Sequence, residues 1–130
     1  MSFALIDKRR SAHNQSEVVT VVGELKDKHV LIVDDMIDTA GTIFNAACVA
    51  KEKGALSVVV AATHGIFSGD SIEKLSNDVI DQVFISDTIE IPEESHFDKL
   101  RIISSAKIFA ETINRIHKGE SVSKLFRKVT

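Results

Sequence analysis

The segment from Val30 to Thr42 constrains the fold more than any other part of the chain. It opens with Val-Leu-Ile-Val, an apolar run rich in β-branched residues, which predicts a buried β-strand. Two carboxylates, Asp34 and Asp35, come next, and we expect them where that strand ends. A turn of small and hydroxyl-bearing residues then leads into a helical pattern. This order of elements predicts an α/β fold that binds its ligand at the carboxyl ends of the strands.

The turn itself, Asp38-Thr39-Ala40-Gly41-Thr42, has the composition of a phosphate-binding loop. A helix N-terminus offers unpaired backbone N–H groups and a positive dipole end to an anion, and small residues let the backbone approach it. Asp38 is alternatively the N-cap of the helix. The carboxylates of Asp34 and Asp35 can accept bonds from sugar hydroxyls or hold Mg²⁺. The segment therefore predicts a site for a sugar phosphate.

The remaining pattern alternates strands with helices, which predicts one domain with a parallel, doubly wound sheet. The charged segment from Asp7 to Glu17 has no apolar period and is predicted to be a mobile loop. Strands are predicted at 3–6, 18–22, 29–33, 56–62, 83–85 and 100–103, and helices at 39–53, 71–75 and 106–117. The strand at 56–62 is apolar throughout, so we expect it to be buried on both faces.

Helical spacing also predicts an apolar face on each of two helices. In the first helix the apolar positions are Ile43, Ala46, Ala47 and Ala50, and Gly54 is the predicted C′ cap. In the last helix, Ile108 or Phe109, Ile113 and Ile116 form one stripe, and the helix stops before Gly119.

Composition excludes several classes of function. The chain has 130 residues, of which 44% are hydrophobic, and a net charge of −3, which argues against a general nucleic-acid binder. No apolar run approaches the ~20 residues of a membrane span. The single cysteine, Cys48, cannot form an internal disulfide and suits a reducing, cytoplasmic compartment. Because it falls within a helical pattern, we expect Cys48 to serve packing.

Three further sequence motifs narrow the choice of protein family. They are Leu-Ile-Asp-Lys-Arg-Arg at 5–10, Thr-His-Gly-Ile-Phe-Ser-Gly at 63–69 and Gly-Glu-Ser-Val-Ser-Lys-Leu-Phe at 119–126. The segment 30–42 resembles the phosphoribosyl-diphosphate (PRPP) motif of the type I phosphoribosyltransferase fold, a parallel sheet flanked by helices. Together, the blocks resemble the C-terminal half of ribose-phosphate diphosphokinase, also called PRPP synthetase, from about Ala4 to Phe126.

The resemblance assigns roles to particular residues. It implies that Lys8 and Arg10 are loop cations that stabilise the transferring group, with Arg9 beside them and Arg10 also near ribose 5-phosphate. Without it, this block would be interpreted as a solvated basic turn. It implies that Asp34 and Asp35 contact the ribose or Mg²⁺, and that the 5-phosphate is bound by Asp38, Thr39, Ala40, Gly41 and Thr42.

Two other regions receive weaker roles from the same resemblance. His64 is placed near the nucleotide side of the site but not in catalysis. Ser121, Ser123 and Phe126 match a tail that some synthetases use to bind regulatory phosphate or ADP at a subunit interface, although Lys124 stands where an aromatic residue is usual. The other histidines show no metal-ligand spacing.

The implied activity is transfer of the diphosphoryl group of ATP to ribose 5-phosphate, with Mg²⁺ as cofactor, in a cytoplasmic homo-oligomer. Such synthetases carry an N-terminal ATP-binding half and a pyrophosphate loop, and we find neither in these 130 residues. We therefore expect the chain alone to be inactive.

One alternative is a PRPP-consuming phosphoribosyltransferase, which should show an aromatic base-recognition hood; we find no candidate. The other is a non-catalytic, synthetase-associated regulatory subunit, against which Lys8 and Arg10 argue.

Overall fold

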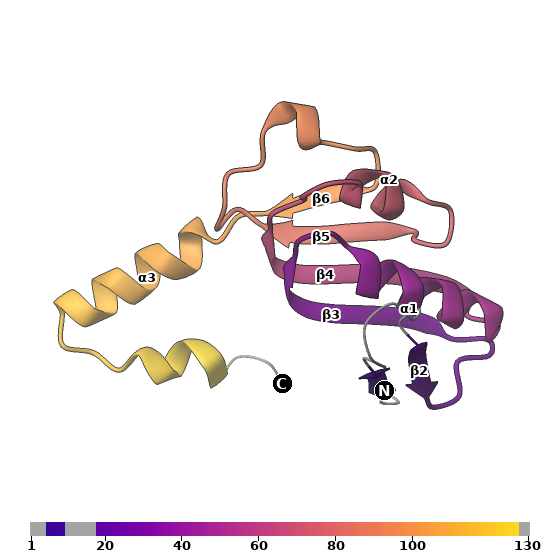
Figure 1. The fold of residues 1–130 in the computed structure, drawn as a ribbon. Coiled ribbons are helices and arrows are strands. Elements are labelled where there is room, and N and C mark those ends of the chain that lie inside the picture. The colour runs from indigo at the N-terminus through magenta and orange to yellow at the C-terminus, as the bar shows by residue number, and fades with distance from the viewer. Residues whose placement is uncertain (1–4, 10–17, 128–130) are drawn as a thin grey trace.

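The computed structural model describes residues 5–9 and 18–127, and it describes side chains from 23 to 125. A four-stranded parallel sheet forms its centre, with the strands in sequence order (Figure 1). These strands are β3 (His29–Ile37), β4 (Ser57–Gly65), β5 (Gln82–Ser86) and β6 (Leu100–Ile103). The connections include α1 (Gly41–Glu52), α2 (Ser71–Ser76) and the short 3₁₀ helix η1 (Glu93–Ser95). The predicted α/β parallel sheet is confirmed.

The core lies between one face of this sheet and the helices α1 and α2. The four apolar residues that helical spacing places on one face of α1 are all buried, and they share one cluster with Ile32, Val58, Val83 and Leu75. The opposite face of the sheet is uncovered within the described residues: Leu31 is 49% and Val33 72% exposed. The expectations of a doubly wound sheet and of a β4 buried on both faces are therefore not met here. On β4 the residues from Ser57 to Ala61 alternate between half-buried and buried because only one face is packed.

The N-terminal segment departs from the predicted loop. β1 (Leu5–Arg9) pairs antiparallel with β2 (Val18–Val22), and Lys8 faces Val19 across the pair. The strand predicted at 18–22 is confirmed, but Asp7 to Arg9 continue β1 and are not part of a loop. The hydrogen-bond partner offered by β2 outweighs the low strand propensity of these charged residues. Residues 10–17 lie outside the described part of the chain.

At the C-terminal end, α3 (Ala106–His117) has the predicted bounds and is followed by the 3₁₀ helix η2 (Val122–Arg127). Figure 1 shows α3 extending from the carboxyl edge of the sheet, away from α1 and α2. Its apolar stripe does not pack on the sheet: Phe109 is 55% and Ile113 65% exposed. A period of 3.6 residues identifies an apolar face, but it does not identify what covers that face.

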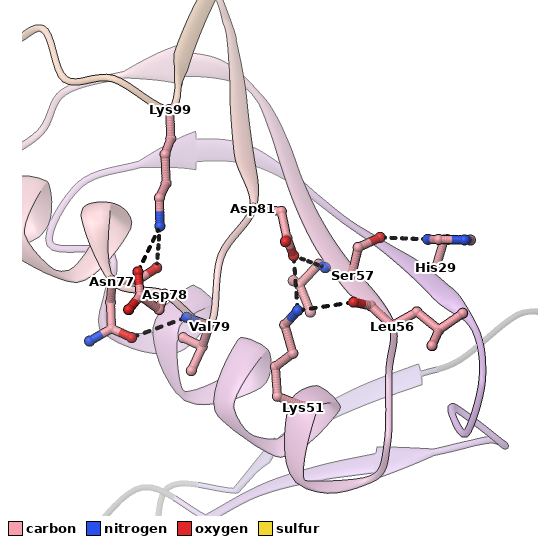
Figure 2. A network of polar contacts seen from close by, with 10 residues as sticks. His29, Lys51, Leu56, Ser57, Asn77, Asp78, Val79, Asp81 and Lys99 are labelled. Atoms are coloured by element: carbon pink, nitrogen blue, oxygen red, sulfur yellow. Dashed lines mark hydrogen bonds and ion pairs between the residues drawn. The ribbon is translucent and has the colours of Figure 1, made fainter.

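The amino ends of the strands are held by a polar network (Figure 2). Asp81 accepts hydrogen bonds from Lys51 Nζ at 3.0 Å and from the Val58 N–H at 2.7 Å. Burial acts to raise the pKa of Asp81, but these bonds outweigh it and the net shift is downward. Lys99 donates to the Asn77 carbonyl at 2.9 Å. The network thus ties α1, β4 and the approach to β5 at the edge of the sheet where the strands begin.

None of the helices in the described residues is long and apolar enough to cross a membrane.

Candidate functional site

The connection from β3 to α1 forms a depression of about 160 Å³ at the carboxyl edge of the sheet. Its lining consists of Asp34 and the residues from Met36 to Ile43, which include every residue of the predicted phosphate turn. The helix begins later than predicted, at Gly41, and its N-cap is Ala40 rather than Asp38. The N-cap interpretation of Asp38 is therefore wrong. Ala40 has φ 58° and ψ 5°, a left-handed conformation that is uncommon for a residue with a Cβ.

Three consecutive carbonyls of this connection are bonded to the segment that follows β4. The Ile37 oxygen accepts from the N–H of Ile66 at 2.8 Å and of Phe67 at 3.2 Å, and the Asp38 oxygen accepts from the Ser68 N–H at 3.1 Å. The Thr39 oxygen accepts from Lys74 Nζ at 3.3 Å. In a trans peptide the carbonyl and the N–H point in opposite directions. Each of the three bonded carbonyls points toward the segment that follows β4. The backbone N–H group of the next residue in each case therefore points away from that segment.

The start of α1 leaves room for a ligand. An α-helix provides no intrahelical partner for its first backbone N–H groups, and its N-terminal end carries partial positive charge. A Cβ added at Gly41 would meet no other protein atom within 4 Å. Packing within the protein therefore does not require a glycine at position 41. The open space and the helix end together can accommodate an anion.

Asp34 and Asp35 lie inside β3, three and two residues before its last residue, and not at its end as predicted. Both side chains are exposed. Asp34 Oδ1 accepts a bond from the Asp35 N–H at 2.9 Å, so its other oxygen remains for a ligand. Asp34 also lines a second depression of about 280 Å³ on the uncovered face of the sheet, together with Val33, Ala61 and Phe84.

His64 belongs to β4, and its ring contacts one member of a small network of hydroxyl groups. His64 Nδ1 lies 2.8 Å from Thr88 Oγ1. The hydroxyls of Ser86 and Thr88 both donate to the Thr63 carbonyl, at 2.6 and 3.1 Å. The ring of His64 is thereby oriented by Thr88, two residues after the end of β5, at the carboxyl edge of the sheet.

The remaining predicted site residues are placed less completely. Lys8 and Arg9 lie on β1, where the backbone alone is described, and Arg10 falls outside the described residues. Ser121 and Ser123 have their hydroxyl oxygens 2.7 Å apart, and Phe126 lies in η2. Cys48 is half-buried with a free thiol, and burial raises its pKa, which agrees with a packing role.

Metal binding has no preformed protein cage in the part of the chain that the structure describes. No three His, Cys, Asp or Glu side chains gather there as a metal site. Mg²⁺ commonly binds through one or two carboxylates plus substrate phosphates. The exposed pair Asp34 and Asp35 fits that mode of binding, in which the substrate supplies the other ligands.

Two features of the site were missed from the sequence. Lys74 reaches Thr39 across 35 residues, and the one local signal was its i,i+4 pairing with Asp70, whose carboxylate it contacts at 2.6 Å. Asp87 holds Ser104 and Ser105 at the start of α3, and no pattern in the sequence pointed to that cluster.

Fold and site together define a parallel α/β domain with a polar depression between its first parallel strand and the following helix. Comparison with known proteins identifies the family: residues 7–127 match the model of the phosphoribosyl synthetase-associated domain, and the chain belongs to this family.

The chain is 50% identical, over 123 residues, to a ribose-phosphate pyrophosphokinase of Caldanaerobacter subterraneus subsp. tengcongensis, with 95% of this chain and 39% of that protein covered. It is 44% identical to the chloroplastic ribose-phosphate pyrophosphokinase 2 of Oryza sativa, with 95% of this chain and 31% of that protein covered. A crystal structure of phosphoribosylpyrophosphate synthetase from Mycobacterium smegmatis superposes with a TM-score of 0.79 at 36% identity, covering 89% of this chain and 37% of that one. The chain thus spans about two fifths or less of these relatives.

Proposed function

We propose that this chain supplies the ribose 5-phosphate site of a ribose-phosphate pyrophosphokinase, as the C-terminal domain of a longer enzyme. The observation that carries the proposal is the set of three carbonyls, of Ile37, Asp38 and Thr39, all bonded away from the depression. This arrangement turns backbone N–H groups and the N-terminal end of α1 toward one small space. A phosphate group is the ligand that such a space favours.

In this proposal the residues Asp38 to Thr42 hold the 5-phosphate, and the carboxylates of β3 hold the sugar. The free oxygen of Asp34 accepts a bond from a ribose hydroxyl, since Asp34 lines the same depression as the turn. Asp35 lies next to it and is exposed. Both carboxylates would hold Mg²⁺ together with substrate phosphates, and the ion would neutralise charge that develops on the transferring group.

The reaction is transfer of a diphosphoryl group. The C1 hydroxyl oxygen of ribose 5-phosphate bonds to the β-phosphorus of ATP, while the bond from that phosphorus to the α–β bridging oxygen breaks. The hydroxyl proton is lost, and the products are PRPP and AMP. The protein's contribution to such a step is positioning and cationic stabilisation, which we assign to Lys8 and Arg10.

The names of the relatives favour this function over the consumption of PRPP. The bacterial and chloroplast relatives described above are pyrophosphokinases by name.

By the same kinship we propose that ATP is bound by an N-terminal half in the longer enzyme and that the enzyme is a cytoplasmic homo-oligomer. A regulatory role for Ser121, Ser123 and Phe126 is part of the proposal, and it is supported by the 2.7 Å approach of the two serine hydroxyls.

The test is titration of the ¹⁵N-labelled chain with ribose 5-phosphate, read from the backbone amide signals. The discriminating variant is Gly41→Val, because a Cβ at this position meets no protein atom within 4 Å and Gly41 lines the depression. Valine has a helix propensity no worse than that of glycine, so the fold should persist. Ala106→Val is the matched control, since Ala106 is the first residue of the other 12-residue helix.

We expect the amides of residues 38–43 to shift in the wild type and in Ala106→Val, and to remain unchanged in Gly41→Val. Equal binding by Gly41→Val, or shifts confined to another surface, would show that the phosphate lies elsewhere. An unchanged thermal midpoint for Gly41→Val separates the loss of the ligand from the loss of the fold.

A further inference from the structure

We propose that Lys74 is a positioning residue for the depression between β3 and α1: it holds the Thr39 carbonyl and thereby directs the Ala40 N–H toward the ligand. The inference deepens the proposed function and rests on it for the identity of the ligand. The contact itself does not depend on that function, because both of its partners belong to the protein: Lys74 Nζ lies 3.3 Å from the Thr39 oxygen.

The ammonium group of Lys74 is fixed from two sides. Asp70, the residue before α2, accepts a bond from it at 2.6 Å, and Thr39 accepts the second. The Lys74 side chain is 27% exposed, so its stem is largely packed. The bond from Lys74 lowers the pKa of Asp70, which keeps this carboxylate charged as an anchor. An ammonium group has three donors and can serve both acceptors at once.

The Thr39–Ala40 peptide, which Lys74 holds, is adjacent to a strained residue. Ala40, with φ 58°, occupies a left-handed conformation in which its Cβ is crowded. Rotating the Thr39–Ala40 peptide by about half a turn would bring Ala40 back to negative φ, but it would also exchange the directions of the Thr39 carbonyl and the Ala40 N–H. The bond to Lys74 opposes that rotation. The strained conformation is thus stabilised from α2.

The neighbouring peptides are held differently, which gives Lys74 its separate role. The oxygens of Ile37 and Asp38 accept backbone N–H groups from residues 66–68. The Thr39 oxygen alone in this run of three is held by a side chain. A substitution at Lys74 can therefore release one peptide and leave the other two in place.

Positioning and charge attraction predict different salt dependence. An ammonium group that acts on phosphate through space loses its effect as salt shortens the Debye length to about 3 Å at 1 M. A group that fixes the direction of a backbone N–H keeps its effect, because the geometry of the loop is retained. Asp70 also compensates the charge of Lys74 locally. We therefore expect most of the effect of Lys74 to persist at high salt.

The experiment compares the wild-type chain with Lys74→Met and Lys74→Arg, and uses Lys107→Met on α3 as the charge-matched control. The first measurement, without ligand, is the ¹³C shift of the Thr39 carbonyl and the hydrogen exchange of the Ala40 amide. The second is the dissociation constant for ribose 5-phosphate at low salt and at 1 M salt. We expect Lys74→Met to change both ligand-free signals and to weaken binding by about tenfold at either salt concentration, as loss of a charged hydrogen bond would.

Lys74→Arg should keep most of the affinity, because it retains a donor and the charge, and Lys107→Met should behave as wild type. An unchanged Thr39 carbonyl signal in Lys74→Met overturns the inference, and so does a binding defect that disappears at high salt. If the ligand-free signals change as expected but the wild type binds no ribose 5-phosphate, the positioning role of Lys74 is supported and the proposed function is overturned.

Discussion

Asp87 Oδ1 accepts two hydrogen bonds from Ser105, one from its backbone N–H at 2.6 Å and one from its hydroxyl at 2.5 Å. The other oxygen of the same carboxylate accepts the Ser104 hydroxyl at 2.6 Å. Asp87 follows β5, and the two serines connect β6 to α3. One carboxylate thus fixes the point from which α3 leaves the carboxyl edge of the sheet.

This cluster predicts a specific response to acid. The bonds from Ser104 and Ser105 lower the pKa of Asp87 from 3.8 to about 2. A carboxylate with a lowered pKa in the folded state stabilises the fold fully above its unfolded value, and this contribution is lost as the pH falls from about 4 through about 2. We expect the amide signal of Ala106 to follow this titration in the wild type and to lose the response in Asp87→Ala. Asp98→Ala, which removes another exposed carboxylate, should leave the response of Ala106 intact.

A second prediction concerns Gly65, the last residue of β4. A Cβ there would lie 3.0 Å from Ile85 Cγ2 and 3.0 Å from Phe67 Cζ, closer than most packed atoms approach a Cβ. We expect Gly65→Ala to lower the free energy of unfolding by about 1–3 kcal/mol, as overpacking does. The shift of Phe67 should also disturb its bond to the Ile37 carbonyl and weaken phosphate binding. Urea unfolding with Gly41→Ala as the unclashed control measures the effect; equal midpoints for the two variants would contradict it.

Local periodicity accounts for much of what the sequence predicted correctly. The bounds of β6 and α3 and the buried positions of α1 follow from patterns within a few residues. Gly54 was predicted as the C′ cap of α1, and it has φ 85° with its N–H bonded to the Lys51 carbonyl. Such features depend on neighbours in the sequence, so a single chain is sufficient to find them.

What the sequence did not reveal depends on partners far along the chain. Asp7 to Arg9 form a strand because β2 pairs with them, which no local pattern in that charged block indicates. The bond from Lys74 to Thr39 joins residues that only the folded loop brings together. Composition predicts a phosphate-binding turn from Asp38 to Thr42, but the left-handed conformation of Ala40 and the three bonded carbonyls required the tertiary structure.

A third prediction addresses Lys8, which lies on β1 opposite Val19. In a full-length relative, replacing the lysine that corresponds to Lys8 with alanine should lower kcat on the order of 100-fold or more, with little change in the KM for ribose 5-phosphate. That pattern is expected for a cation that contacts the transferring group only in the transition state. The matched control replaces the residue corresponding to Lys107, on the exposed surface of α3. Steady-state kinetics that show an unchanged kcat would remove Lys8 from the mechanism.

The fourth prediction is that this 130-residue chain alone makes no PRPP at a meaningful rate. It spans only 39% of the Caldanaerobacter relative. In-line transfer requires both substrates to be held together, and positioning supplies about 7–11 kcal/mol of barrier reduction. The proposed ribose 5-phosphate site provides for one substrate, so most of the catalysis should be lost even with that site intact. Release of AMP from ATP, measured with ribose 5-phosphate and Mg²⁺, should be at background for the chain and strong for the full-length relative. Comparable turnover by the two would place the ATP site within these residues. The candidate position would then be the second depression, around Val33 and Phe84.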